Sequence, residues 1–307
     1  MADGESDGGD DGGERDPADA LLVAAHEIRL DILRALWAAE SHALPFSDLR
    51  KAVGVRDTGQ FNYHLSKLEG RFVAHVEDRY ELLYPGHRLV DAVQSGVFDR
   101  EIDRRELAVD GTCRDCGSDL AFTYREFAGR VRCPECDETV LGYPFDPGGF
   151  DGREDDAAVV RAFDRRTRRY WRSTTDGVCL VCAGPTEVTL VDEASTLQAL
   201  DRYDDHYAAD QPVLAAVDCQ HCSFYSYVPV GVTLLDHPGV VGALYQRGVD
   251  VTDRRLWDLP FVVDADRVEL VETDPLRVAV TAGPDADLTV TLDDTATVVS
   301  VEGIDAG

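Results

Sequence analysis

The sequence has 307 residues, and its 30 Lys+Arg against 59 Asp+Glu give a formal net charge of −29 and a pI near 4.4. With 44% hydrophobic residues the chain is able to bury a core, which excludes wholesale disorder. It contains no run of about 18 apolar residues, so we expect no membrane-spanning segment. The acidic N-terminus does not resemble a secretory signal. We therefore expect a soluble, cytoplasmic protein of about two domains.

The basic residues are almost all arginine. Lys51 and Lys67 are the only lysines, and the carboxylates are spread along the whole chain. This composition is typical of halophilic proteins, which stay soluble in multimolar salt where charge is strongly screened. The net charge therefore does not exclude a nucleic acid as partner.

The chain begins with an acidic segment and then changes in character. Residues 1–16 contain seven acids and five glycines, which predicts a disordered acidic tail. Residues 17–98 carry nine Lys+Arg and eleven Asp+Glu, so nearly all of the excess negative charge lies elsewhere. This segment therefore has a much smaller excess of carboxylates than the rest of the chain.

Residues 17–98 are predicted to form three helices, a hairpin and a final helix. Apolar residues recur at helical spacing over 18–39. Ser47 is a suitable N-cap for a helix that ends at Gly54, and Asp57 is placed to cap a helix over about 58–69. The other expected elements are an extended piece at 44–46, two strands at 72–76 and 80–83 around a turn at 77–79, and a helix over 85–95. This order is that of a winged helix-turn-helix DNA-binding domain.

The helix over 58–69 has the character of a recognition helix. Phe61, Leu65 and Leu68 share one face, with His64 at its edge as a packing residue, so the polar side chains point the other way. Amides read bases, hydroxyls reach phosphates and basic groups neutralise them. The alternative is an ordinary solvent-exposed helix. The expected DNA contacts, which include Arg79 at the hairpin tip, are Arg56, Thr58, Gln60, Asn62, Tyr63, Ser66, Lys67 and Arg79.

All eight cysteines occur in C-x-x-C pairs, which predicts two tetrahedral metal sites. The spacing of the first two pairs is that of a zinc ribbon, while the second two are separated by a longer insertion. We expect two structural zinc ions, because four thiolates leave no coordination position open for catalysis. An iron–sulfur cluster and unligated or redox-active thiols are the alternatives. The expected ligands are Cys113, Cys116, Cys133 and Cys136 for one site and Cys179, Cys182, Cys219 and Cys222 for the other.

The fold class expected is therefore α+β: a winged helix-turn-helix, then a zinc ribbon over 105–150, then a helix and a second zinc-knuckle α+β domain over 155–307. Asp236, His237 and Pro238 predict a helix start, and Gly248 its end. The sequence of residues 195–210 indicates no clear secondary structure. Strands are expected at 187–191, around Val262, and at 268–271, 277–281, 288–292 and 298–301.

Arginines follow one face of the helix expected over 155–174. Arg161, Arg165, Arg168 and Arg172 recur at helical spacing, so this face could touch DNA, dock on an acidic surface of the same protein, or simply be solvated. The sequence contains no phosphate-binding glycine loop, no zinc-protease motif and no nucleophile elbow. We therefore expect a protein that is not an enzyme.

The segment from His26 to Leu83 resembles ArsR-like winged-helix transcriptional regulators of halophilic archaea. The similarity is carried by HEIRLDILRAL at 26–36, FSDL at 46–49 and GQFNYHLSKL at 59–68. It implies a cytoplasmic, dimeric, DNA-binding regulator whose flanking helices pair the protomers. Metal-sensing members carry cysteines within the helix-turn-helix, whereas residues 17–98 contain none. The cysteine-bearing region is similar to zinc-ribbon extensions found in such proteins.

These observations predict a transcriptional regulator that binds double-stranded DNA as a homodimer, with a zinc-stabilised region for contact with an effector or the transcription machinery. The alternative is a basal factor that resembles archaeal transcription factor E and binds RNA polymerase. An enzyme with its activity in residues 179–302 is the third interpretation.

Overall fold

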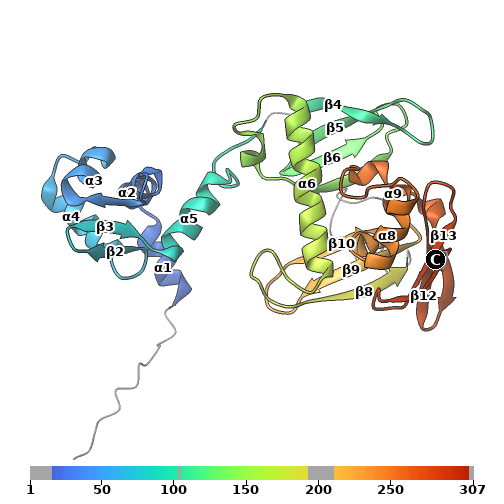
Figure 1. Ribbon diagram of the computed structural model, residues 1–307. Coiled ribbons are helices and arrows are strands. Elements are labelled where there is room, and N and C mark those ends of the chain that lie inside the picture. The colour runs from blue at the N-terminus through green and yellow to red at the C-terminus, as the bar shows by residue number, and fades with distance from the viewer. Residues whose placement is uncertain (1–15, 103–104, 193–210, 304–307) are drawn as a thin grey trace, which may run out of the picture. The chain divides into compact units, whose positions relative to one another are not determined.

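The computed structural model describes residues 16–102, 105–192 and 211–303, which form a mixed α+β protein with several antiparallel sheets. The chain divides into two compact units, Met1–Asp99 and Arg100–Gly307 (Figure 1). The expected acidic tail, apart from Asp16, and the ambiguous stretch at 195–210 lie outside the described residues.

The first unit contains five helices and a three-stranded antiparallel sheet of order β1-β3-β2 among its described residues. An additional strand, formed by the extended piece near Pro45, joins the expected two-stranded hairpin through β3. The elements in chain order are α1 (Pro17–Ala24), α2 (Glu27–Ala38), β1 (Ala43–Pro45), α3 (Phe46–Val53), α4 (Thr58–Leu68), β2 (Val73–Val76), β3 (Arg79–Leu82) and α5 (Tyr84–Gln94).

Two helix boundaries differ from the prediction. A single helix over 18–39 is wrong, because His26 adopts an extended conformation and its Nδ1 accepts the N–H of Ile28, so a new helix starts there. Ser47 is not the N-cap of α3, which begins at Phe46 directly after Pro45. The caps at Asp57 and Gly54 are confirmed: the Asp57 carboxylate accepts the N–H of Gln60, and Gly54 ends α3 at φ 79°.

The core of the first unit lies between α2, α3 and α4. Leu36, Leu49 and Phe61 are fully buried, one from each of these helices. Their burial stabilises this unit together with the other residues of the core, because apolar burial contributes about 25 cal/mol per Å². This packing holds the inner face of α4 and leaves its outer face to solvent.

The described residues of the second unit form three antiparallel sheets and a long helix (Figure 1). The sheets have the orders β4-β5-β6-β7, β10-β9-β8 and β11-β12-β13-β14. The strands of the first two sheets are β4 (Arg105–Thr112), β5 (Asp119–Arg125), β6 (Ala128–Arg132), β7 (Thr139–Pro144), β8 (Thr186–Asp192), β9 (Val213–Cys219) and β10 (Tyr225–Pro229). The third sheet consists of β11 (Val268–Thr273), β12 (Leu276–Ala282), β13 (Leu288–Leu292) and β14 (Val298–Glu302). The helices are α6 (Asp156–Thr175), α8 (Pro238–Gln246) and α9 (Pro260–Val263), with short 3-10 turns η1 (Pro147–Phe150), η2 (Val230–Leu234), η3 (Leu256–Asp258) and η4 (Ala265–Arg267).

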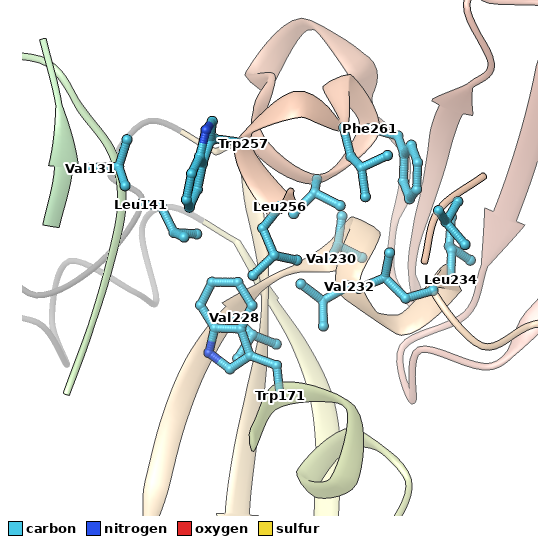
Figure 2. Packing of buried hydrophobic residues seen from close by; sticks show 14 of the residues in the cluster. Val131, Leu141, Trp171, Val228, Val230, Val232, Leu234, Leu256, Trp257 and Phe261 are labelled. Carbon is cyan, nitrogen blue, oxygen red and sulfur yellow. The ribbon is translucent and has the colours of Figure 1, made fainter. Parts of the chain in front are cut away.

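One continuous core joins the regions predicted as a zinc ribbon and as a second domain. The α6 residue Phe163 contacts Phe122 of β5, with 5.1 Å between ring centroids, and Trp171 contacts Tyr143 of β7 at 5.6 Å. The core continues through η2, η3 and α9 to the third sheet (Figure 2). The strand expected around Val262 is wrong, because this residue belongs to α9 and is fully buried against neighbouring segments. The predicted helix that starts at Pro238 is confirmed, with His237 as its N-cap.

Candidate functional sites

The four C-x-x-C pairs lie in four turns of the same kind. In each turn the N–H of the first cysteine donates to the carbonyl five residues later, at 2.7 to 2.9 Å. The residue after the second cysteine has positive φ in three of the turns. The donor and acceptor residues are Cys113 and Ser118, Cys133 and Glu138, Cys179 and Gly184, and Cys219 and Phe224. The chain therefore builds one ligand-presenting turn four times.

The first sheet brings the first two turns together. Because β4 and β6 are both antiparallel to β5, the turns that follow them lie at the same end of the sheet. The Sγ atom of Cys113 lies 3.6 Å from that of Cys136, and the Sγ atom of Cys116 lies 3.4 Å from that of Cys133. All four sulfurs therefore surround one point.

The second sheet does the same for the other two turns. Thr186 at the start of β8 pairs with Cys219 at the end of β9, so the turn before β8 meets the turn after β9. The sulfurs of Cys179 and Cys222 are 3.8 Å apart, and those of Cys182 and Cys219 are 3.5 Å apart. The long insertion between the pairs is therefore compatible with a compact site.

Both clusters fit a tetrahedral metal ion. A zinc–sulfur bond of about 2.3 Å implies about 3.8 Å between sulfurs in a tetrahedron, whereas a disulfide requires about 2 Å. The four sulfurs of each cluster lie within 4.8 Å of one another, and all eight cysteines are free thiols. Each cluster can therefore hold one thiophilic metal ion, and a full set of four thiolates closes the site to substrate.

In each cluster, hydrogen-bond donors favour the thiolate form of one cysteine, which is the form that binds a metal. A hydrogen bond from the Ser118 side chain lowers the pKa of Cys116 to about 6, and the N–H groups of Cys222 and His221 lower the pKa of Cys219 to about 6. The clusters differ in exposure. Cys116 and Cys136 of the first cluster are exposed, whereas the second contains no exposed cysteine.

The structure places the polar residues of α4 on its outer face. Phe61, Leu65 and Leu68 are fully buried, and His64 packs inside as expected, with 6% of its surface exposed. On the outer face, the Tyr63 side chain is 55% exposed and the Lys67 ammonium lies 5.5 Å from the centre of its ring. The other expected contact residues of this region are also exposed, namely Arg56, Thr58, Gln60, Asn62 and Ser66. Seven of the eight residues predicted to contact DNA thus lie exposed in this region. Six of them lie on α4, and Arg56 directly precedes its N-cap.

Arg79 is not at the tip of the hairpin. It is the first residue of β3 and pairs with Val76, because Glu77 adopts φ 53° and the turn closes over Glu77 and Asp78 alone. The Arg79 guanidinium donates to the Ala43 carbonyl at 2.6 Å and to the Ser41 hydroxyl at 3.2 Å. Arg79 therefore joins β1 to the hairpin, and the tip itself is acidic.

Arg50 has a role that the sequence pattern did not indicate. Its guanidinium donates to the carbonyls of Val55 at 3.3 Å and Arg56 at 2.9 Å, which fixes the turn between α3 and α4. A basic residue four positions before a glycine C-cap is a weak signal for such a contact. Arg50 thus orients the entry to α4.

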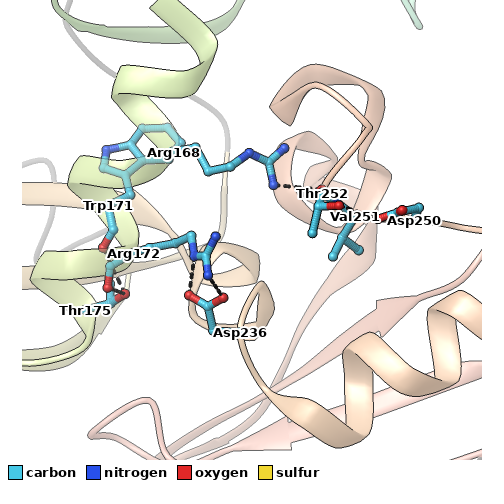
Figure 3. A network of polar contacts seen from close by, with 8 residues as sticks. All are labelled: Arg168, Trp171, Arg172, Thr175, Asp236, Asp250, Val251 and Thr252. Atoms are coloured by element: carbon cyan, nitrogen blue, oxygen red, sulfur yellow. Dashed lines mark hydrogen bonds and ion pairs between the residues drawn. The ribbon is translucent and has the colours of Figure 1, made fainter.

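The arginine face of α6 is engaged mainly within the protein (Figure 3). Arg172 forms a bidentate pair with Asp236, and Arg161 lies 3.8 Å from Asp155. Arg168 is buried and donates to two backbone carbonyls, and Arg165 is exposed. Of the three alternatives for this face, the structure favours contact within the same protein, because most of these arginines bond to groups of their own unit.

No helix among the described residues is long and apolar enough to cross a membrane. A family model described as a domain of unknown function (DUF7351) matches residues 110–298, which is more than half of the chain. A second model, described as a domain of unknown function (DUF7347), matches residues 17–93. The two matched ranges lie on either side of the division between the two units. No curated protein and no solved structure matches the chain.

Proposed function

The chain belongs to the family of the domain of unknown function DUF7351, and we propose that it is a DNA-binding transcriptional regulator. Its DNA-binding domain is a winged helix-turn-helix formed by the first unit, and two structural zinc ions hold the second unit together. The similarity of residues 26–83 to ArsR-like regulators of halophilic archaea supports this proposal.

The observation that carries the proposal is the composition of the exposed face of α4. It presents two amides, a tyrosine, two hydroxyls and a lysine, while its inner face is fixed by three fully buried apolar residues. A helix held in this way keeps its outer side chains in register with base edges in a major groove. The residues between Arg50 and His75 carry five Lys+Arg against two acids, so this segment is locally positive in an acidic chain.

The proposed DNA-binding form is a homodimer. Leu21 and Leu22 of α1 are 64% and 71% exposed, and Tyr84 at the start of α5 is 74% exposed. Tyr84 also lines an apolar pocket of about 530 Å³, together with Ala20 of α1 and Pro85. Burying these side chains against a second copy is favourable by roughly 1.5 to 3 kcal/mol for each large apolar residue.

The test is DNA binding by the full chain with zinc at fixed high salt. Selection from a random duplex pool followed by titration should recover a preferred sequence, and Asn62→Ala should weaken binding to it by about 1–3 kcal/mol with little effect on scrambled DNA. Lys67→Ala should weaken both duplexes more evenly, because phosphate contacts carry little sequence information. Gln246→Ala, which changes an exposed amide of the second unit, is the matched control. Binding by Asn62→Ala and Tyr63→Ala that equals wild type would contradict the proposal.

A second candidate is a basal factor that resembles archaeal transcription factor E and binds RNA polymerase. The exposed apolar residues at one metal turn favour a protein partner there: Val178, Leu180 and Val181 are 46%, 43% and 55% exposed. Such a factor would bind polymerase and show no preferred duplex in the same selection. The two candidates therefore differ in the result of one experiment.

A further inference from the structure

His64 lies on the recognition helix of the proposed DNA-binding domain but points inward. It is 6% exposed, and its Nδ1 atom is buried without a hydrogen-bond partner. Its ring packs on that of His26, with 4.1 Å between centroids and 37° between planes. On the outer side, Tyr63 contacts the same imidazole edge-on at 5.2 Å. The position of Tyr63 is thus supported by a pair of histidines in contact.

His26 has a second role, at the start of α2. Its Nδ1 accepts the N–H of Ile28 at 3.3 Å and so caps this helix. An N-cap contributes about 1 kcal/mol to the stability of a helix. Because α2 packs on α4, the imidazole that contacts His64 also fixes the start of the neighbouring helix.

Every charge that acts on His64 opposes its protonation. Burial lowers the pKa of His64 from 6.5, and both His26 and the guanidinium of Arg29 lower it further. Arg29 lies in the first turn of α2, and its Nε atom is buried without a partner. The helices α1 and α3 also pack on α4, and their carboxylates Asp16, Asp19 and Asp48 are exposed to solvent. A second positive charge beside Arg29 would therefore be poorly compensated.

We propose that His26, His64 and Arg29 form a pH-sensitive switch that loosens α4 and lowers DNA affinity when the solution is acidified. The switch rests on the proposed DNA-binding function for its consequence, but the loosening of α4 is a property of the free protein. Both histidines belong to the junction of α2 and α4, so protonation of His64 acts directly on the helix that presents Asn62 and Tyr63. The His64 imidazole is buried, so salt screens its repulsion with Arg29 less than it screens surface charge.

The sign follows from the depressed pKa of His64 in the folded state. We call α4 docked when it packs on α2 and released when that contact is loosened. Well above pH 6.5, His64 is neutral in both states, so pH has no effect on the equilibrium between them. As pH falls through 6.5, the released state gains a proton that the docked state does not accept, so the docked state loses stability. The loss continues until the lowered pKa of the docked state is reached.

The test measures DNA affinity of the full chain at about pH 7.5 and about pH 5.5, at constant high potassium chloride. Uptake of one proton with a midpoint near 6.5 predicts a loss of affinity of up to about tenfold for wild type. His64→Leu, which removes the buried titrating group, should change by less than about twofold over the same range. His26→Asn keeps an N-cap but removes the imidazole that lowers the pKa of His64, so it should weaken the dependence.

His87→Gln is the matched control, because His87 forms the other histidine pair of this unit, with His42 at 5.0 Å, and His42 is exposed. It should keep the pH dependence of wild type. Hydrogen exchange of the α4 amides without DNA, compared between wild type and each variant at the same pH, separates the switch from DNA binding. If acid speeds the exchange of the α4 amides in wild type, and His64→Leu or His26→Asn suppresses this increase, the switch is supported even when no duplex is bound. If the exchange responds to acid in the same way in wild type and in both variants, the switch is overturned.

Discussion

The buried guanidinium of Arg168 holds the backbone carbonyl of Val251, with 2.9 Å between Nη1 and the carbonyl oxygen (Figure 3). The same guanidinium reaches the Arg254 carbonyl at 2.5 Å. One turn earlier on α6, the carboxylate of Asp164 accepts the N–H of Leu256 at 2.8 Å. Two side chains of α6 thus satisfy three backbone groups of a segment far away in sequence. This arrangement connects the first two sheets to the segment that leads into the third.

Arg168→Ala should destabilise the second unit by about 3–5 kcal/mol, because removing one partner leaves buried polar groups and the Asp164 carboxylate uncompensated. Arg168 is 8% exposed and Asp164 7% exposed, so water cannot easily replace the lost contacts. Urea unfolding followed by tryptophan fluorescence provides the measurement. Arg165→Ala, on the exposed side of the same helix, is the control and should change stability by less than about 0.5 kcal/mol. Equal effects of both variants would mean that the contacts of Arg168 contribute no more than a surface charge.

Protein prepared with sufficient zinc should contain two metal ions per chain, one in each tetracysteine cluster. Chelator should remove the ion of the first cluster sooner, because Cys116 and Cys136 are exposed there. Elemental analysis during a chelation time course tests both statements. Cys133→Ser should reduce the content to one ion and leave the second cluster loaded. A single ion in wild type would contradict the two-site interpretation, and iron with visible absorbance would favour clusters.

Gly231→Ala should strongly destabilise the second unit. A Cβ atom at this position would clash with the backbone oxygen of Phe261, so η2 and α9 would have to separate. Because overpacking of a core typically costs about 1–3 kcal/mol and here the clash is with backbone, we expect the upper end of that range. Gly242→Ala is the matched control in α8, where a Cβ meets nothing within 4 Å and should stabilise the helix by about 0.5–1 kcal/mol. Comparable thermal midpoints for the two variants would contradict this description of the η2–α9 contact.

The local elements were largely predictable because their signals are local. The Asp57 cap, the Gly54 stop and the four cysteine turns each depend on a few adjacent residues. The inner face of α4 followed from helical periodicity in the same way. These features require no knowledge of distant contacts.

The predictions that were wrong depend on contacts distant in sequence or on unusual backbone conformation. His26 interrupts an apolar pattern that continues on both sides, and only its extended conformation and cap reveal the break. Val262 is buried by η2 and neighbouring segments, and a short apolar run is equally compatible with strand and helix. The burial of Arg168 follows from carbonyls more than 80 residues away, which helical spacing alone does not indicate.

Thermal unfolding should shift to lower temperature as potassium chloride falls from molar to about 0.1 M, with zinc kept constant. The excess of 59 Asp+Glu over 30 Lys+Arg makes the chain repel itself, and dilution of the salt removes the screening that weakens this repulsion. We expect a decrease of at least about 5 °C, equivalent to about 2 kcal/mol for a unit of this size. Calorimetry of the full chain at several salt concentrations tests this prediction. A midpoint independent of salt would remove the basis for the halophilic interpretation of the composition.

Arg79→Ala distinguishes a structural role of this residue from a DNA contact. Its guanidinium bonds to Ala43 and Ser41, so truncation should release β1 from β3 and destabilise the first unit by about 1 kcal/mol. DNA affinity at a temperature where the variant is fully folded should then change little, whereas Lys67→Ala should weaken binding without affecting stability, because Lys67 is exposed on α4. Measuring unfolding and DNA titration for both variants separates the two effects. If Arg79→Ala instead weakens binding while the unfolding midpoint stays at the wild-type value, the guanidinium leaves β1 to reach the duplex, and the hairpin contacts DNA as a wing in spite of its acidic tip.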